Sequence, residues 1–436
     1  MERHFIRRGA FIAAAGLMAA LAPGVALGDI TVHAMYASQY TERPDGVSHN
    51  GEWIVRGNRI VNVATNADTH IPGLVPEVVP PSSHATETIH PVAVTDDGSV
   101  AFSYSGYRYY DSLIQTERFY LYAACRTDAV NGTVPLFPLP GSSEMTTSRV
   151  VGASADGSVV VGSIAPDPDA EPRPFVWTEA DGLTMIPGSP GSQFDAFAAR
   201  AISADGSTVV GYWRDGGANV PFRWTRAGGT VALALPPGET SGWAGAVSDD
   251  GLYTVGLVGE SMVRWTADGP PEVLTTGPEI FRPDDVTASG QIIVGVNLVP
   301  RTSGSGYDAV QSVWTEVGGA RSIDEIVAAE APGELTGSGV DDVYLISGDG
   351  SRLIVQVESS IDYTASIGGL GDFLNPCSAS DVTLDFATDV SDFFALASNF
   401  GVTTGAARAD GDLTGDGAVD VDDFFPLASG FGCAAN

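Results

Sequence analysis

A short motif recurs seven times along most of this chain of 436 residues. Each copy consists of an apolar residue, a serine or threonine, two mostly small or polar residues and a glycine, and a strand-like apolar run follows it. Successive motif glycines are 39 to 60 residues apart, and they are Gly51, Gly98, Gly157, Gly206, Gly251, Gly290 and Gly350. A period of this size, with one turn and several short strands per unit, is typical of the blades of a β-propeller.

The motif has a direct physical interpretation. Asp-Gly or Asn-Gly between short apolar runs favours a tight hairpin turn, because glycine adopts a positive φ without a steric penalty. The runs that follow, such as the sequence VVVG at 159–162, are short and β-branched, as strands buried on both faces require. A second signature places one tryptophan in each of four successive units, at Trp177, Trp224, Trp265 and Trp314. We expect these side chains to pack between blades rather than to form a sugar-binding platform.

The sequence therefore predicts an all-β domain, a β-propeller of about seven blades over residues 29–372. Seven motifs indicate seven blades, and six or eight remain open because the first and last units are degenerate. Residues 30–36, ITVHAMY, alternate like a strand. We expect this strand to complete the last, short blade and so to close the ring.

Residues 150–320 resemble a family of bacterial extracellular repeats that is named for a His-Ala-Phe signature. The resemblance rests on the segments ASADGSVVVGS and PFVWTEADG. The phenylalanine and tryptophan of the pattern are present at Phe175 and Trp177, whereas Arg173 and Pro174 stand where the signature has histidine and alanine. The resemblance implies export and a propeller-like repeat, and it implies no known reaction.

The last residues carry a separate pattern, in which oxygen-bearing side chains alternate along a twelve-residue loop. Residues 412–423 read DLTGDGAVDVDD, and Gly417 occupies position 6, where a calcium loop of the EF-hand type bends sharply. Calcium is a hard cation that prefers six to eight oxygen ligands. The ligands predicted at positions 1, 3, 5, 7, 9 and 12 are Asp412, Thr414, Asp416, the carbonyl of Ala418, Asp420 and Asp423.

A second loop of the same pattern begins 31 residues earlier, at residues 381–392 with the sequence DVTLDFATDVSD. Its position 6 is Phe386 instead of glycine, so we expect this site to bind calcium more weakly or to stay empty. The ligands predicted in this loop are Asp381, Thr383, Asp385, the carbonyl of Ala387, Asp389 and Asp392. Calcium is the cofactor that the sequence predicts.

Each loop leads into a segment with apolar residues at helical spacing, i, i+3 and i+7, which places them on one helix face. Pro426 is compatible with such a helix because we expect it in the first turn. The residues on the two faces are Phe393, Leu396 and Phe400 in the first segment and Phe424, Leu427 and Phe431 in the second.

A duplicated calcium loop, each copy followed by a helix, resembles the dockerin family. Residues 377–433 are most similar to dockerin-type anchors that end in Gly-Cys, here Gly432-Cys433. The resemblance implies a cohesin-like or surface-anchoring partner that reads loop positions 10 and 11, which are Val390-Ser391 and Val421-Asp422.

We assign residues 373–436 to this small dockerin-like domain. Cys377 and Cys433 bracket it, and the sequence leaves open whether they form a disulfide. Cys125 stands alone upstream, and we interpret it as a small buried apolar residue.

The first 28 residues have the features of an export signal. Arg3, Arg7 and Arg8 form a basic segment, residues 9–21 are apolar and uncharged, and small residues precede Asp29. We expect cleavage before Asp29 after general secretion, and the Arg7-Arg8 pair is also compatible with twin-arginine export. No later stretch reaches ~18 apolar residues, so we expect no transmembrane segment in the mature chain.

The chain has 54 acidic and 21 basic residues and a formal net charge of −33. This charge argues against nucleic acid and anionic membranes as partners, because both require basic patches on the protein. It suits an extracellular or cell-surface location that is rich in divalent cations, where the self-repulsion is screened.

No residue set in the sequence has an evident catalytic logic. The six histidines share no metal-like spacing and no nucleophile motif accompanies them, so we interpret them as surface or structural residues. The pattern favours an exported, non-catalytic binding or display protein whose propeller presents loops to a glycan or a protein. The alternative is a dockerin-bearing polysaccharide-degrading enzyme, a glycoside hydrolase or a sialidase-like propeller. Two facing carboxylates in a deep central pocket would favour the enzyme, and a plugged channel would favour binding.

Overall fold

The computed structural model of the chain describes residues 31–35, 45–72, 86–111, 116–137, 147–165, 172–188, 197–267, 269–316, 318–333, 335, 339–358, 363–368, 381–382, 388, 390–403, 406, 410–414 and 418–431. The expected export signal lies outside these residues, as do Cys377 and Cys433. None of the described helices is long and apolar enough to cross a bilayer.

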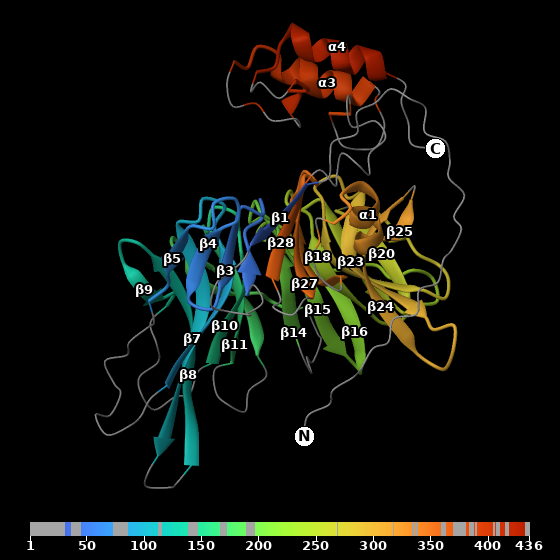
Figure 1. The fold of residues 1–436 in the computed structure, drawn as a ribbon. Coiled ribbons are helices and arrows are strands. Elements are labelled where there is room, and N and C mark those ends of the chain that lie inside the picture. The colour runs from blue at the N-terminus through green and yellow to red at the C-terminus, as the bar shows by residue number, and fades with distance from the viewer. Residues whose placement is uncertain are drawn as a thin grey trace.

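Seven four-stranded antiparallel sheets follow one another and form a seven-bladed β-propeller (Figure 1). In the first six blades the four strands are consecutive in the sequence, and each pairs with the next. The first strand of a blade contacts the first strand of the neighbouring blade, so these strands surround the propeller axis and the fourth strands lie outermost. The predicted all-β propeller of about seven blades is confirmed.

The strands of the first three blades are β2 (Gly46–Val47), β3 (Trp53–Arg56), β4 (Arg59–Asn62) and β5 (Asp68–His70); β6 (Thr86–Val94), β7 (Val100–Asp111), β8 (Thr116–Asp128) and β9 (Gly132–Pro135); and β10 (Thr147–Ala153), β11 (Val159–Ala165), β12 (Arg173–Thr178) and β13 (Gly182–Met185).

The strands of the next three blades are β14 (Phe197–Ile202), β15 (Thr208–Asp215), β16 (Ala218–Thr225) and β17 (Gly229–Ala232); β18 (Gly242–Val247), β19 (Tyr253–Val258), β20 (Ser261–Thr266) and β21 (Glu272–Val273); and β22 (Ile280–Val286), β23 (Ile292–Pro300), β24 (Tyr307–Thr315) and β25 (Gly319–Ser322).

The seventh blade combines the two ends of the propeller. It contains β26 (Gly339–Ile346), β27 (Arg352–Glu358), β28 (Tyr363–Gly368) and, as its outermost strand, β1 (Thr31–Met35). β1 pairs antiparallel with β28, from Thr31 opposite Gly368 to Met35 opposite Thr364, and the two strands lie side by side in Figure 1. The strand expected at residues 30–36 therefore closes the ring, as the sequence predicts.

The recurrent motif forms the turn between the first and second strands of every blade. In the fourth blade, the hydroxyl of Ser203 accepts from the N–H of Thr208 (3.0 Å) and donates to Asp205, which in turn accepts from the N–H of Ser207 (2.9 Å). Gly206 has a φ of 70°. The same arrangement recurs in all seven turns, with Asn50 and Ser289 in place of the aspartate in the first and sixth blades.

A second glycine, in the middle of the second strand of blades three to six, is required for a different reason. The first strand of blades three to six contains a register shift of the β-bulge type, next to this glycine. A Cβ atom on the glycine would collide with a carbonyl oxygen of the bulged strand, because the two backbones approach closely there. These glycines are Gly162, Gly211, Gly256 and Gly295.

The repeated tryptophans occupy equivalent positions in the third strands of blades three to six and are buried, with 1 to 8% of their surface exposed. Trp224, for example, packs with Val161 and Val176 of the preceding blade. The core is thus a series of apolar clusters between neighbouring blades, and the prediction of inter-blade packing is confirmed.

The described residues also contain three helices. α1 (Ile323–Glu330) follows β25, is N-capped by Ser322, and buries Ile323 and Ile326 between the sixth and seventh blades. α3 (Val390–Asn399) and α4 (Val421–Gly430) lie in the C-terminal region and pack through Leu396 and Leu427 (Figure 1).

Two expectations about these helices are wrong. Phe400 and Phe431 follow the last helical residues and are exposed, so they do not belong to the helix faces. Pro426 lies in the second turn of α4 and not in the first, because the capping residue Asp420 starts this helix at Val421.

Candidate functional site

The C-terminal loop at 412–423 is held by its last residue. Asp423 is fully buried, and its Oδ1 accepts from the N–H groups of Leu413 (2.8 Å) and Thr414 (2.9 Å) near the start of the loop. Its Oδ2 accepts from the N–H of Asp420 (2.9 Å), whose own side chain caps α4 through the N–H of Asp422 (2.8 Å). The two ends of the loop and the first turn of the helix therefore form one hydrogen-bonded unit.

The charge at this position is stabilised by the backbone. Burial by itself raises the pKa of the Asp423 carboxyl, but the N–H groups of Asp420, Thr414 and Leu413 outweigh that effect, and the pKa is below its usual value. Asp412 at loop position 1 is 5% exposed and accepts from the hydroxyl of Thr414 (3.3 Å). Two carboxylates thus lie buried at the two ends of one short loop.

The loop at 381–392 repeats this arrangement. Asp381 and Asp392 are fully buried, and Asp392 accepts from the N–H of Val382 (2.7 Å), as Asp423 does from that of Leu413. The duplication in the sequence is therefore a duplication of structure at the residues that the structure describes.

The predicted calcium ligands are brought together in part. The described parts of the loop at 412–423 contain Asp412, Thr414, Ala418, Asp420 and Asp423, and those of the loop at 381–392 contain Asp381 and Asp392. The predicted ligands Asp416, Thr383, Asp385, Ala387 and Asp389 lie outside the described residues. Among described residues, no three His, Cys, Asp or Glu side chains gather as a metal-binding group. The donor set is nonetheless made of oxygen alone and includes buried carboxylates, which is the chemistry that fits Ca²⁺.

The propeller carries a second cluster of titratable groups, on its axis. The residue that follows the hydroxyl in each turn faces the neighbouring turns, and backbone hydrogen bonds link several of these turns to one another. The N–H of Asp96 donates to Ala155 (2.9 Å), and that of Ala155 donates to Ala204 (2.8 Å). The side chains at this turn position are those of His49, Asp96, Ala155, Ala204, Asp249 and Ala288, with Gly348 in the seventh blade.

His49 of the first blade spans this ring. Its Nδ1 lies 3.2 Å from Oδ1 of Asp249 in the fifth blade, and its Nε2 lies 2.9 Å from the carbonyl oxygen of Ala153 in the third. Residues of blades that are not neighbours can contact each other only across the propeller axis. A carbonyl oxygen accepts and cannot donate, so Nε2 carries a proton, and an ionised Asp249 requires a proton on Nδ1 as well. The geometry is that of an imidazolium ion held between acceptors.

The electrostatics agree with this geometry. Burial opposes the charge of His49, but the hydrogen bond and the negative charge of Asp249, the Ala153 carbonyl and the charge of Asp285 raise its pKa to about 9. Burial, together with the charge of Asp249, raises the pKa of Asp285 to about 7. Burial also raises the pKa of Asp96, which accepts from the N–H of Asn50 (3.1 Å).

The groups of the axial cluster are engaged in hydrogen bonds within the protein. Both nitrogens of His49 are engaged, and Asp285 accepts from the N–H groups of Val286 (2.8 Å) and Ile346 (2.9 Å). A general base needs a free acceptor within reach of a substrate. Sequence reasoning placed His49 among structural or surface residues but did not find its partners, because Asp249 is 200 residues away.

No family model matches this chain, and no curated protein matches it. Similar solved structures include TolB from Acinetobacter baumannii, with 12% identity over 65% of this chain and 79% of that one and a TM-score of 0.34. The Cps50 (Swd1) β-propeller domain of Myceliophteria thermophila is 10% identical over 78% of this chain and 98% of that one, with a TM-score of 0.41. An oligogalacturonate lyase in complex with manganese is 13% identical over 78% and 90% of the two chains, with a TM-score of 0.41. At these identities the likeness concerns the fold alone.

Proposed function

We propose that this chain is an exported, non-catalytic binding or display protein, held at the cell surface or in an extracellular assembly by a calcium-dependent, dockerin-like tail. The observation that carries the proposal is the duplicated loop-and-helix unit. Asp392 and Asp423 are fully buried at matching positions, and each binds the backbone near the start of its own loop.

In the loop at 412–423, the ion would be held by Asp412, Thr414, Asp416, the Ala418 carbonyl, Asp420 and Asp423. Bound calcium would supply the positive charge that offsets the mutual repulsion of these carboxylates. Asp420 and Asp423 also cap α4, so the loop and the orientation of the helix are coupled.

The two helices present a surface that supports docking to a partner. Phe393 and Phe394 on α3 are 40 and 62% exposed, and Phe424 and Phe425 at the matching positions of α4 are 42 and 65% exposed. Exposed aromatic side chains in such number on a small domain mark a protein interaction surface. A cohesin-like or surface-anchoring protein with an apolar binding face is the partner that this surface fits.

The alternative function, polysaccharide degradation, requires two carboxyl groups that face one another across a substrate. Asp249 and Asp285 on the propeller axis are instead bound to His49 and to backbone N–H groups, respectively. This arrangement supports the binding function over the hydrolase.

A fractionation experiment on the producing cells tests the proposal. The full-length protein should remain with the cell surface in calcium and should be released by a chelator such as EGTA. The double substitution Phe394→Ser and Phe425→Ser should release it even in calcium, whereas Val130→Ser, at a 90% exposed residue of the propeller, should not. Retention that ignores both the chelator and the double substitution would contradict the proposal, and so would turnover of substrates in a glycosidase panel.

A further inference from the structure

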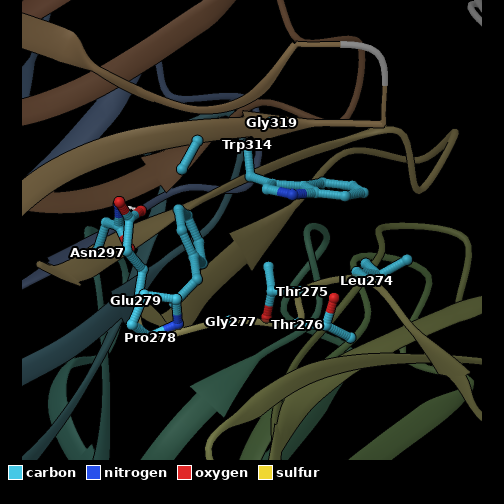
Figure 2. Close-up of a pocket in the computed structure, with 11 residues that line it drawn as sticks. Leu274, Thr275, Thr276, Gly277, Pro278, Glu279, Asn297, Trp314 and Gly319 are labelled. Atoms are coloured by element: carbon cyan, nitrogen blue, oxygen red, sulfur yellow. Dashed lines mark hydrogen bonds between the residues drawn. The ribbon is translucent and has the colours of Figure 1, made fainter.

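A cavity of about 410 Å³ lies between the fifth and sixth blades. Figure 2 shows Trp314 of β24 across from Thr275 and Thr276, which belong to the connection between β21 and β22. Glu279 and Asn297 lie together at one end of the same cavity.

The neighbouring junction, between blades four and five, is filled differently. There the indole N–H of Trp265 donates to the carbonyl of Ala234 (2.7 Å), and Leu233 and Leu235 pack against the same tryptophan cluster. The N–H groups of Leu233 and Leu274 donate to the carbonyl oxygens of Pro221 and Met262, respectively. Each of these carbonyls lies three residues before the tryptophan of its strand, β16 or β20, so the two connections align.

In the connection between β21 and β22, the two positions after the aligned Leu274 are polar. Thr275 replaces Ala234, and Thr276 replaces the apolar Leu235. No described residue accepts a hydrogen bond from the indole N–H of Trp314. The junction between blades five and six therefore lacks the tryptophan-to-backbone bond of its neighbour, and it also lacks a leucine equivalent to Leu235.

Asn297 is a second departure from the repeat at the same place. It lies two residues after the bulge glycine of its blade, where the preceding blades have the apolar residues Ile164, Trp213 and Val258. Its side chain is 5% exposed, and its Nδ2 donates to Oε2 of Glu279 (2.8 Å). Its Oδ1 is buried and has no hydrogen-bond partner among the described residues. A buried acceptor without a partner lowers stability, and such a group calls for a functional explanation.

The groups around the cavity define the chemistry of a ligand. Asn297 and Glu279 offer acceptors, and the indole N–H of Trp314 offers a donor. Thr275 accepts from the N–H of Met262 (2.9 Å), which leaves its hydroxyl proton free to donate. A ligand must therefore both donate and accept, as sugar hydroxyls do, while Glu279 and the net charge of −33 disfavour an anion. The volume suits one or two sugar rings.

We infer that this cavity binds one unit of a neutral saccharide, with Asn297, Glu279, Thr275 and the N–H edge of Trp314 as its hydrogen-bonding groups. Because Trp314 is only 4% exposed, its edge and not its face meets the ligand. The inference rests on the proposed role of the propeller as a binding module, and it names the chemical class of the ligand.

Saturation-transfer NMR and titration calorimetry on the full mature chain test this site with glucose, galactose, mannose, N-acetylglucosamine, cellobiose and maltose. At least one sugar should bind, and Asn297→Val should weaken it by about tenfold or more. The same substitution should leave Tm unchanged or raise it, because it removes the buried acceptor. Trp314→Phe should weaken binding similarly, whereas Trp265→Phe in the neighbouring junction should not. A disaccharide that binds more tightly than its monosaccharide identifies a unit of a longer glycan, and equal binding identifies a free sugar.

Absence of binding by the wild-type protein to every sugar would overturn the inference, and so would binding that Asn297→Val leaves unchanged. Calcium binding measured on the same samples separates this outcome from a failure of the tail. Loss of the sugar signal with normal calcium binding refutes the cavity alone, and the reverse result refutes the tail alone.

Discussion

Ser203 shows what a single hydroxyl contributes in this propeller. It binds one backbone N–H and one carboxylate, and so fixes both sides of a turn whose glycine has a positive φ. In the equivalent turn of the third blade, the N–H of Ser158 lowers the pKa of Asp156, and the Ser154 hydroxyl adds to this effect against a contribution from burial. Each such bond contributes on the order of 1 kcal/mol. The recurrence of serine or threonine in the motif is therefore a consequence of hydrogen bonding.

The axial histidine leads to a prediction about pH. His49 faces Asp249, Asp285 and Asp96, and its folded pKa of about 9 exceeds the ordinary value of 6.5. Its contribution to stability is thus fully present below pH 6.5 and is lost as the pH rises through 9. His49→Gln should lower the unfolding free energy at pH 6 by on the order of 2 kcal/mol and should match the wild type above pH 9.

Thermal unfolding of the full chain between pH 5 and 10 measures this effect. Asp285 acts in the same direction, because its folded pKa of about 7 exceeds 3.8 and its contribution is lost as the pH rises from 4 through 7. His70→Gln, at an exposed residue of β5, is the matched control and should keep the wild-type profile. A wild-type Tm that rises steadily from pH 6.5 to 9 would contradict the assignment of His49.

The bulge glycines give a prediction whose sign is opposite to the general rule. Alanine in place of a strand glycine usually stabilises by about 0.5–1 kcal/mol. At Gly256 the new Cβ would collide with the carbonyl oxygen of Trp243, so Gly256→Ala should instead destabilise the propeller by about 1–3 kcal/mol. Urea unfolding measures the difference, and a variant more stable than the wild type would show that the bulge does not require glycine.

At the scale of elements, ring closure depends on one short strand. β1 is the outermost strand of the seventh blade and pairs with β28, and Val32 packs against the core that β26, β27 and β28 share with α1. A chain that starts at residue 37 should therefore unfold at a Tm at least several degrees below that of the chain that starts at Asp29. Scanning calorimetry on both chains measures this, and equal Tm values would show that β1 adds nothing to closure.

The elements also show which local features can be predicted from sequence. The alternation of ITVHAMY and the duplicated loops identified β1, α3 and α4, because in each case the pattern is local. α1 was not predicted, since its eight residues follow an outer strand without a repeat elsewhere in the chain. The prediction that Pro426 lies in the first turn of α4 was also wrong, because the start of α4 depends on a capping interaction between Asp420 and Asp423.

At the scale of the whole molecule, the repeat predicted the architecture, and it could not predict the groups that meet across it. The motif shows that a ring of blades forms, since each blade buries its faces only against its neighbours. The contact between His49 and Asp249 and the cavity at Asn297 depend on which blades face one another and on how two blades are filled. Departures from the repeat, such as Asn297 at a position where the preceding blades have apolar residues, are the signal in the sequence that points to the cavity between the fifth and sixth blades.

Titration calorimetry on the mature chain tests most directly whether the C-terminal loops bind calcium. We expect at least one site in the micromolar to millimolar range. Asp416→Ala should abolish the tighter site, Asp385→Ala should have a smaller effect, and Asp215→Asn at the exposed end of β15 in the propeller should have none. No heat of calcium binding by the wild-type chain, or identical heats for the wild type and Asp416→Ala, would contradict calcium binding by these loops.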